Sequence, residues 1–113
     1  PYEDAAGFAR RYAADGVVWY FDIFAQTADQ VFYSLWSMKQ AGWFENARAF
    51  LFGRVMFPQG DYPAAIRRAL GDAAIVWNAD IGHVKPAFTL INGVMARVAA
   101  VGGRGTLEME LRA

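Results

Sequence analysis

The feature that most limits how this chain can fold is the unbroken apolar run Val17–Phe21, which lies between Asp15-Gly16 and Asp22. A short apolar run bounded by turn-forming residues is typical of a strand that is buried on both faces, as in a parallel or mixed sheet. The run is far too short to cross a membrane, since a membrane-spanning helix needs about 20 apolar residues. The chain is therefore expected to build a sheet around this strand, with no membrane-spanning segment.

Helices and further strands alternate along the rest of the chain. Residues 27–30 (Thr-x-x-Gln) have the spacing of a capping box, and Asp61 with Pro63 is typical of a helix start. Two C-terminal strands flank the glycine-rich residues 102–105, which predicts a hairpin. This order predicts an α/β fold with a mixed sheet, in a single domain over residues 1–113. The expected helices span residues 3–14, 27–42 and 61–71, and the other strands span residues 49–52, 74–77, 94–101 and 106–111.

The charge balance and the lack of metal ligands exclude several classes of partner. The 113 residues include 11 Lys and Arg against 11 Asp and Glu, so the formal net charge is zero. A neutral domain has no electrostatic attraction to nucleic acid or to an anionic membrane, and neither is expected as a partner. With no Cys and one His, no transition-metal site and no cofactor are expected.

The chain is rich in apolar residues for its size. Hydrophobic residues make up 56% and aromatic residues 16% of it, which is more than a small domain is expected to bury in its own core. Surplus apolar side chains are typical of an interface with another domain or subunit, although a self-contained core rich in tryptophan is the alternative. The surplus and the N-terminal Pro indicate a piece of a longer protein. We expect it to self-associate or to present an apolar face to a partner domain.

Two residues capable of acid–base chemistry follow predicted strands. Asp22 ends the run Val17–Phe21, and His83 comes soon after the strand predicted over residues 74–77. Because catalytic groups gather at the carboxyl ends of strands in open α/β sheets, the two side chains are expected to lie within hydrogen-bonding distance or one water apart. A carboxylate that accepts the Nδ1–H of the imidazole leaves Nε2 as a general base. By residue type alone, a loop histidine and a strand-ending aspartate are more often structural or solvent-exposed.

The sequence offers a cation for substrate binding but no nucleophile. Arg54 closes the second predicted strand and is a candidate for binding a substrate carboxylate, although an ordinary surface role is commoner. Ser34 and Ser37 are the only serines, and both fall in the middle of a predicted helix. A catalytic serine usually lies on a sharp turn beside backbone N–H groups that hold an oxyanion. If Asp22 and His83 belong to a triad, its serine comes from elsewhere.

Three segments together carry a resemblance to a known family. The first is the hydrophobic strand Gly16–Asp22, which ends in an acid, and the second joins Leu35–Phe44 to Phe50–Arg54 in a helix–Gly–strand–Gly-Arg pattern. The third runs from Asn78–His83 to Thr89–Gly93 and contains a Gly-His pair. In this order they resemble the C-terminal half of the LD-carboxypeptidase family of serine peptidases, which includes the microcin C self-immunity hydrolases.

The resemblance implies a domain of the swivelling β/β/α type that forms part of a Ser-His-Glu hydrolase. Such hydrolases cleave the L,D amide bond before the terminal D-Ala of murein tetrapeptides, act in the cytoplasm during peptidoglycan recycling and are often homodimers. The nucleophilic Ser and the oxyanion N–H groups belong to an N-terminal α/β domain, for which this chain has no matching positions. His83 matches the triad base. Asp22 stands where the family has Glu, and its side chain is one methylene shorter.

Three functions remain open on these grounds. The chain is expected to be the C-terminal half of a carboxypeptidase that acts on murein peptides. A microcin C-type amide hydrolase is one alternative, and a non-catalytic binding or assembly module, in which Asp22 marks decay of the triad, is the other. In isolation the chain is predicted to be inactive, because it lacks the nucleophile and oxyanion hole that form and stabilise a tetrahedral intermediate.

Overall fold

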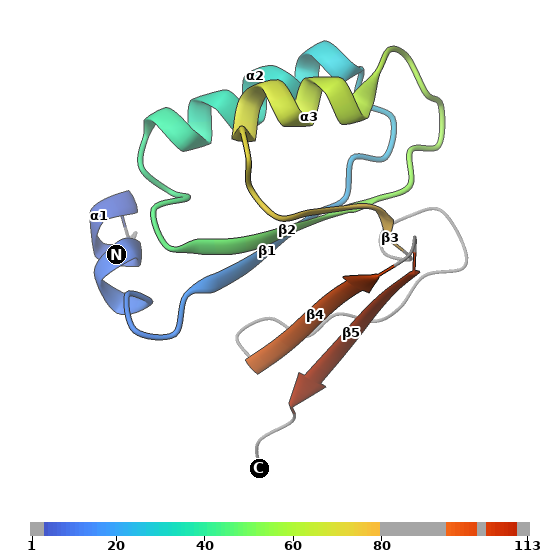
Figure 1. Ribbon diagram of the computed structural model, residues 1–113. Coiled ribbons are helices and arrows are strands. Elements are labelled where there is room, and N and C mark those ends of the chain that lie inside the picture. Colours follow the sequence, from blue (N-terminus) through green and yellow to red (C-terminus); the bar gives the residue numbers. More distant parts are fainter. Residues whose placement is uncertain (1–3, 80–94, 102–103, 111–113) are drawn as a thin grey trace.

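The computed structural model describes residues 4–79, 95–101 and 104–110 of the chain (Figure 1). In chain order its elements are α1 (Ala5–Arg11), β1 (Val17–Phe21), α2 (Ala28–Gln40), β2 (Ala47–Gly53), α3 (Tyr62–Leu70), β3 (Ile75–Ala79), β4 (Met95–Val101) and β5 (Arg104–Glu110). The strands β1, β2 and β3 pair in that order as a parallel sheet, and β4 pairs with β5 as an antiparallel hairpin. Within the described residues, no helix is long and apolar enough to cross a membrane.

The two longer helices begin where the sequence predicts. Thr27 accepts a hydrogen bond from the backbone N–H of Gln30 at 3.2 Å, and the Gln30 side chain accepts one from the Thr27 N–H at 2.9 Å. This reciprocal capping box starts α2. At the start of α3, the Asp61 carboxylate accepts a hydrogen bond from the Ala64 N–H at 3.1 Å. Side chains therefore satisfy backbone donors that would otherwise be left without partners in the first turn of each helix.

The first helix is shorter than predicted. Its span is Ala5–Arg11, against an expectation of residues 3–14. Tyr12 leaves the helical conformation (φ −107°, ψ 15°), and its C=O accepts a hydrogen bond from the N–H of Gly16 at 2.8 Å. Gly16 has a φ of 74°, a left-handed conformation that glycine adopts without steric cost. The chain therefore turns into β1 through residues that the helical pattern had included.

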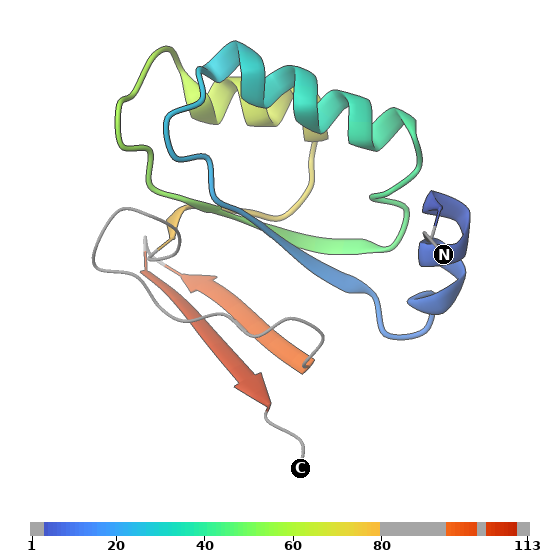
Figure 2. The same ribbon diagram turned by 180° about the vertical axis from the view of Figure 1, so that it is seen from behind.

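The core lies between the parallel sheet and the helices α2 and α3, which cover one of its faces (Figures 1 and 2). The central strand β2 contributes Phe50 and Phe52, α2 contributes Leu35, and α3 contributes Ile66. Burying a side chain of this size stabilises the fold by about 1.5–3 kcal/mol. These contacts hold the two helices against the sheet and so fix the loops that join strands to helices.

The prediction that β1 is buried on both faces is wrong for the described structure. Trp19 and Phe21 pack against the core, but Tyr20, which points to the other face, is exposed over 39% of its surface. The reason is its place in the sheet, since β1 lies at one side of the three strands and β2 occupies the centre. The buried run of Phe50, Leu51 and Phe52 belongs to that central strand.

The C-terminal hairpin is confirmed. β4 pairs with β5 from Met95↔Glu110 to Val101↔Arg104, so the second strand begins earlier than predicted. The hairpin lies on the side of the parallel sheet opposite to α2 and α3 (Figures 1 and 2). The α/β class is therefore confirmed, with parallel and antiparallel pairing both present in the described residues and divided between two sheets.

Candidate functional site

The carboxyl ends of the three parallel strands bring together the first two predicted site residues. Phe21 pairs with Phe52 and Gly53 pairs with Ala79, so the three strands end side by side. Asp22 directly follows β1 and Arg54 directly follows β2. Asp22 is exposed and Arg54 is half-buried. We call this end of the sheet, with the loops that follow β1 and β2, the carboxyl end.

His83 lies outside the described residues. The strand that precedes it, β3, ends at Ala79 at the carboxyl end, beside the end of β2. The expected hydrogen bond between Asp22 and His83 therefore stays a prediction, and the structure places one partner of that pair.

Backbone hydrogen bonds join the loop after β1 to the loop after β2. The N–H of Met56 donates to the C=O of Phe24 at 2.8 Å, and the N–H of Ala28 donates to the C=O of Gln59 at 2.9 Å. Phe24 has a φ of 56°, a conformation that bulky residues adopt only where the surroundings impose it. The two loops that begin with Asp22 and Arg54 are thus held together as a pair.

A buried tyrosine strengthens this pairing, and sequence reasoning missed it. The Tyr62 hydroxyl donates to the C=O of Gln26 at 2.6 Å and accepts from the N–H of Gln59 at 2.9 Å. Its ring is stacked on that of Trp77 in β3, with centroids 5.8 Å apart. The sequence feature that could have indicated this role is the position of Tyr62 directly after the helix cap Asp61. A hydroxyl there lies close to the loops that follow β1 and β2.

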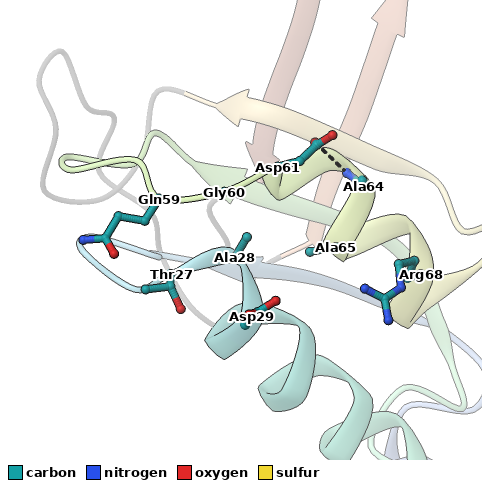
Figure 3. Close-up of a pocket in the computed structure, with 9 residues that line it drawn as sticks. All are labelled: Thr27, Ala28, Asp29, Gln59, Gly60, Asp61, Ala64, Ala65 and Arg68. Atoms are coloured by element: carbon teal, nitrogen blue, oxygen red, sulfur yellow. Dashed lines mark hydrogen bonds between the residues drawn. The ribbon is translucent and has the colours of Figure 1, made fainter.

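An open cavity of about 410 Å³ lies between the starts of α2 and α3 (Figure 3). Gly60 and Ala28 both line the cavity and lie so close together that a Cβ on Gly60 would be 2.7 Å from the Cβ of Ala28. At each helix start beside it, a side-chain cap already takes up one backbone N–H, that of Gln30 through Thr27 and that of Ala64 through Asp61. The residues that line it are Thr27, Ala28, Asp29, Gln59, Gly60, Asp61, Ala64, Ala65 and Arg68.

The described residues hold no group of three or more His, Cys, Asp or Glu side chains that could bind a metal ion. Both serines lie in the middle of α2 and are exposed, as the sequence predicts. Neither Ser34 nor Ser37 belongs to the loops of the carboxyl end. Among the described residues, the candidate site therefore offers an acid and a cation.

Besides Tyr20 on β1 and Met95 on β4, large apolar side chains of the described residues are exposed in two groups. At the carboxyl end they are Phe24, Met56 and Phe57, of which Phe57 is 62% exposed. On the outer side of α2 they are Tyr33 and Trp36, with 65% and 47% of their surfaces exposed. The apolar surplus read from the composition is thus partly on the surface, and exposed apolar patches of this kind are typical of interfaces.

Comparison with known families identifies the chain. The family model of the LD-carboxypeptidase C-terminal domain matches residues 3–98. The chain belongs to this family. The family is one of serine peptidases, and the matched model describes their C-terminal domain. The match spans the positions of Asp22, Arg54 and His83, which are the residues that the sequence singled out.

A solved structure has the same fold as this LD-carboxypeptidase C-terminal domain. It is the muramoyltetrapeptide carboxypeptidase from Oxalobacter formigenes, which is similar with a TM-score of 0.74 and 17% sequence identity. The similarity covers 93% of this chain and 41% of that chain, so the domain spans less than half of that carboxypeptidase. No curated protein matches the chain significantly. The predicted fold is therefore confirmed.

Proposed function

We propose that this domain supplies the base and the acid of a serine triad in a carboxypeptidase that removes the terminal D-Ala of murein tetrapeptides. The observation that carries the proposal is the position of Asp22 at the carboxyl end of the sheet, next to the strand that Arg54 follows, in a chain matched by the family model over residues 3–98. The serine and the oxyanion N–H groups would come from an N-terminal α/β domain of the same protein.

The proposed reaction proceeds in two halves. His83 Nε2 takes the proton of the serine hydroxyl as its oxygen attacks the carbonyl carbon of the L,D amide. The tetrahedral intermediate collapses, the C–N bond breaks, and the imidazolium gives its proton to the amine of the departing D-Ala. Water then attacks the acyl-enzyme with His83 as base, the ester C–O bond to the serine breaks, and the imidazolium returns its proton to the serine oxygen as the shortened peptide leaves. Asp22 orients the imidazole through its Nδ1–H throughout.

Arg54 is proposed to recognise the end of the substrate. The bond to be cleaved lies next to a free carboxylate, and a guanidinium binds a carboxylate through two parallel hydrogen bonds. Arg54 follows the central strand, and its half-buried position favours this role because a charge pair is stronger where water is partly excluded.

We further propose that the full-length protein is a homodimer and works in the cytoplasm, on tetrapeptides released during peptidoglycan recycling. Exposed aromatic side chains on α2, namely Tyr33 and Trp36, support the dimer, since aromatic residues are enriched at such contacts. The cytoplasmic location is the one that the resemblance to the LD-carboxypeptidase family implies.

The deciding experiment is the turnover of a murein tetrapeptide by the full-length protein and its His83→Ala variant. Because triad members act as a unit, kcat is expected to fall by about 10⁶-fold. A double variant, Ser34→Ala with Ser37→Ala, is the control and is expected to keep the parent's activity. Unchanged turnover in His83→Ala would contradict the triad and favour the non-catalytic module. Turnover of a peptidyl nucleotide in place of the tetrapeptide would favour the microcin C-type hydrolase.

A further inference from the structure

Tyr62 occupies a position that links the two loops of the carboxyl end. It is the first residue of α3, and only 3% of its surface is exposed. Its hydroxyl donates to the backbone C=O of Gln26, in the loop after β1, and accepts from the backbone N–H of Gln59, in the loop after β2. Both partners are main-chain atoms, so the contact constrains the path of each loop directly.

The ring of Tyr62 is itself fixed by the core. It stacks on Trp77 of β3 with an angle of 16° between the ring planes. The residue therefore touches an element that belongs to neither loop, and the position of its hydroxyl is determined by the packing of α3 and β3. Through this side chain, α3 and β3 add a contact to each of the two loops, beside the backbone hydrogen bonds that already join them.

The loop after β1 contains a strained residue, Phe24, whose conformation needs support from the surrounding structure. Phe24 holds a φ of 56° while its C=O accepts the hydrogen bond from Met56. A conformation of this kind costs about 1–3 kcal/mol and persists only where the surrounding structure imposes it. Phe24 is two residues after Asp22, and Met56 is two residues after Arg54. The strained contact therefore lies directly beside the proposed acid and the proposed cation.

We propose that Tyr62 is a positioning residue, which fixes the loop that begins with Asp22 relative to the loop that begins with Arg54. This role rests on the proposed hydrolase function, since the two loops hold the acid of the triad and the group that binds the substrate carboxylate. The short side chain of Asp22 makes the role more important. An aspartate reaches less far than the glutamate that the resemblance implies, so an error in backbone position would more easily prevent its proposed contact with the imidazole.

The test is the variant Tyr62→Phe in the full-length protein. Phenylalanine keeps the stacking on Trp77 and removes both hydroxyl hydrogen bonds. We expect amide hydrogen exchange at Gln59 to accelerate and kcat for the tetrapeptide to fall by about 10-fold, because small displacements of catalytic groups have large effects on rate. KM is expected to rise as well, because Arg54, the proposed partner of the substrate carboxylate, begins the loop whose Gln59 loses its hydrogen bond.

Two control variants separate positioning from stability. Tyr33→Phe makes the same change at an exposed tyrosine of α2 and is expected to alter neither exchange nor kcat. Ile66→Val removes a buried methyl group from α3, one turn beyond Tyr62, and lowers stability without touching either loop. It is expected to lower the melting temperature while leaving kcat and the exchange at Gln59 unchanged.

Each outcome supports the inference or overturns it. In an active parent protein, unchanged exchange at Gln59 or unchanged kcat in Tyr62→Phe overturns it and leaves the proposed function standing. An equal loss of kcat in Ile66→Val overturns it as well, because the effect would then come from stability alone. A parent protein with no turnover contradicts the proposed function, and with it the reaction that Tyr62 would serve.

Discussion

The resemblance to the LD-carboxypeptidase family implies a glutamate at the position of Asp22, whose own side chain is one methylene shorter. The structure places Asp22 directly after β1 in a loop tied to its neighbour by backbone hydrogen bonds. A carboxylate that orients an imidazole contributes less to the rate than the imidazole itself, because the base and the nucleophile still operate without it. The loss of kcat when the Asp22 carboxylate is removed therefore measures how well this shorter side chain orients the imidazole.

Asp22→Ala in the full-length protein is expected to lower kcat by about 10³- to 10⁴-fold, less than His83→Ala. Asp22→Glu is expected to keep or raise the activity, since it restores the longer side chain. Asp72→Ala, at an exposed aspartate after α3, is the matched control and should leave turnover as it is. Steady-state kinetics measure all three, and an Asp22→Ala enzyme as fast as the parent would remove Asp22 from the triad.

At the scale of the elements, the close approach of the β2–α3 loop to the start of α2 is a specific packing constraint. Gly60 has a φ of 108°, and a Cβ there would meet the Cβ of Ala28 at 2.7 Å. Gly71, after α3, also has a positive φ of 66°, but no atom lies within 4 Å of the place its Cβ would take. A substitution at Gly60 therefore adds both backbone strain and a steric clash, whereas a substitution at Gly71 adds backbone strain alone.

Gly60→Ala is expected to destabilise the protein by about 2–4 kcal/mol, because strain adds to a clash in a packed region. Gly71→Ala is expected to cost about 1 kcal/mol from backbone strain alone. Urea denaturation followed by circular dichroism measures both values. Equal losses in the two variants would mean that the contact with Ala28 is relieved at no cost.

The elements themselves could be predicted from local patterns, and the way their loops join could not. Apolar runs and helix caps are features of a few neighbouring residues, which is why β1 and the start of α2 were placed correctly. The bonds of Tyr62 to Gln26 and Gln59 depend on two segments meeting across the sheet, and no short pattern records that. The exposure of Tyr20 was missed for the same reason, since strand order is a property of the sheet.

At the scale of the whole molecule, the proposed active site is shared between this domain and another. An acid, a base and a cation can orient a substrate and move protons, but they cannot form an acyl-enzyme without a nucleophile. From the sequence, the resemblance to the family implies that the nucleophilic serine lies in another domain. The serines of this chain agree with that, since both were predicted in the middle of a helix and both lie in the middle of α2. The roles of Asp22, Arg54 and His83 all stay predictions, and so does the position of His83 relative to Asp22.

The 113-residue chain in isolation is expected to release no D-Ala from a murein tetrapeptide above the rate of a blank, because the oxyanion hole and the serine would both be missing. Chromatographic detection of free D-Ala measures this, with the full-length protein as the positive control. Release by the isolated chain at a rate close to that of the full-length protein would place a complete site in this domain.

The full-length protein is expected to have twice its subunit mass in solution, measured by light scattering. Trp36→Ser is expected to shift it toward the monomer, because removing a large exposed aromatic ring weakens an apolar contact. Ser34→Ala, also on α2 and exposed, is the control and should leave the mass unchanged. A monomer at every concentration tested would contradict the dimer.

The position of β1 in the sheet has a consequence for handling the domain. Among the described strands, β1 pairs with β2 alone, so one of its sides offers backbone N–H and C=O groups that no described strand takes up. Its residues Val17–Phe21 carry no charge and no proline, and all of them favour extended backbone. Such a segment recruits strands from other molecules and seeds fibrils. If the domain is produced by itself, aggregation should begin at this strand, and Tyr20→Lys, at an exposed position, is expected to reduce it.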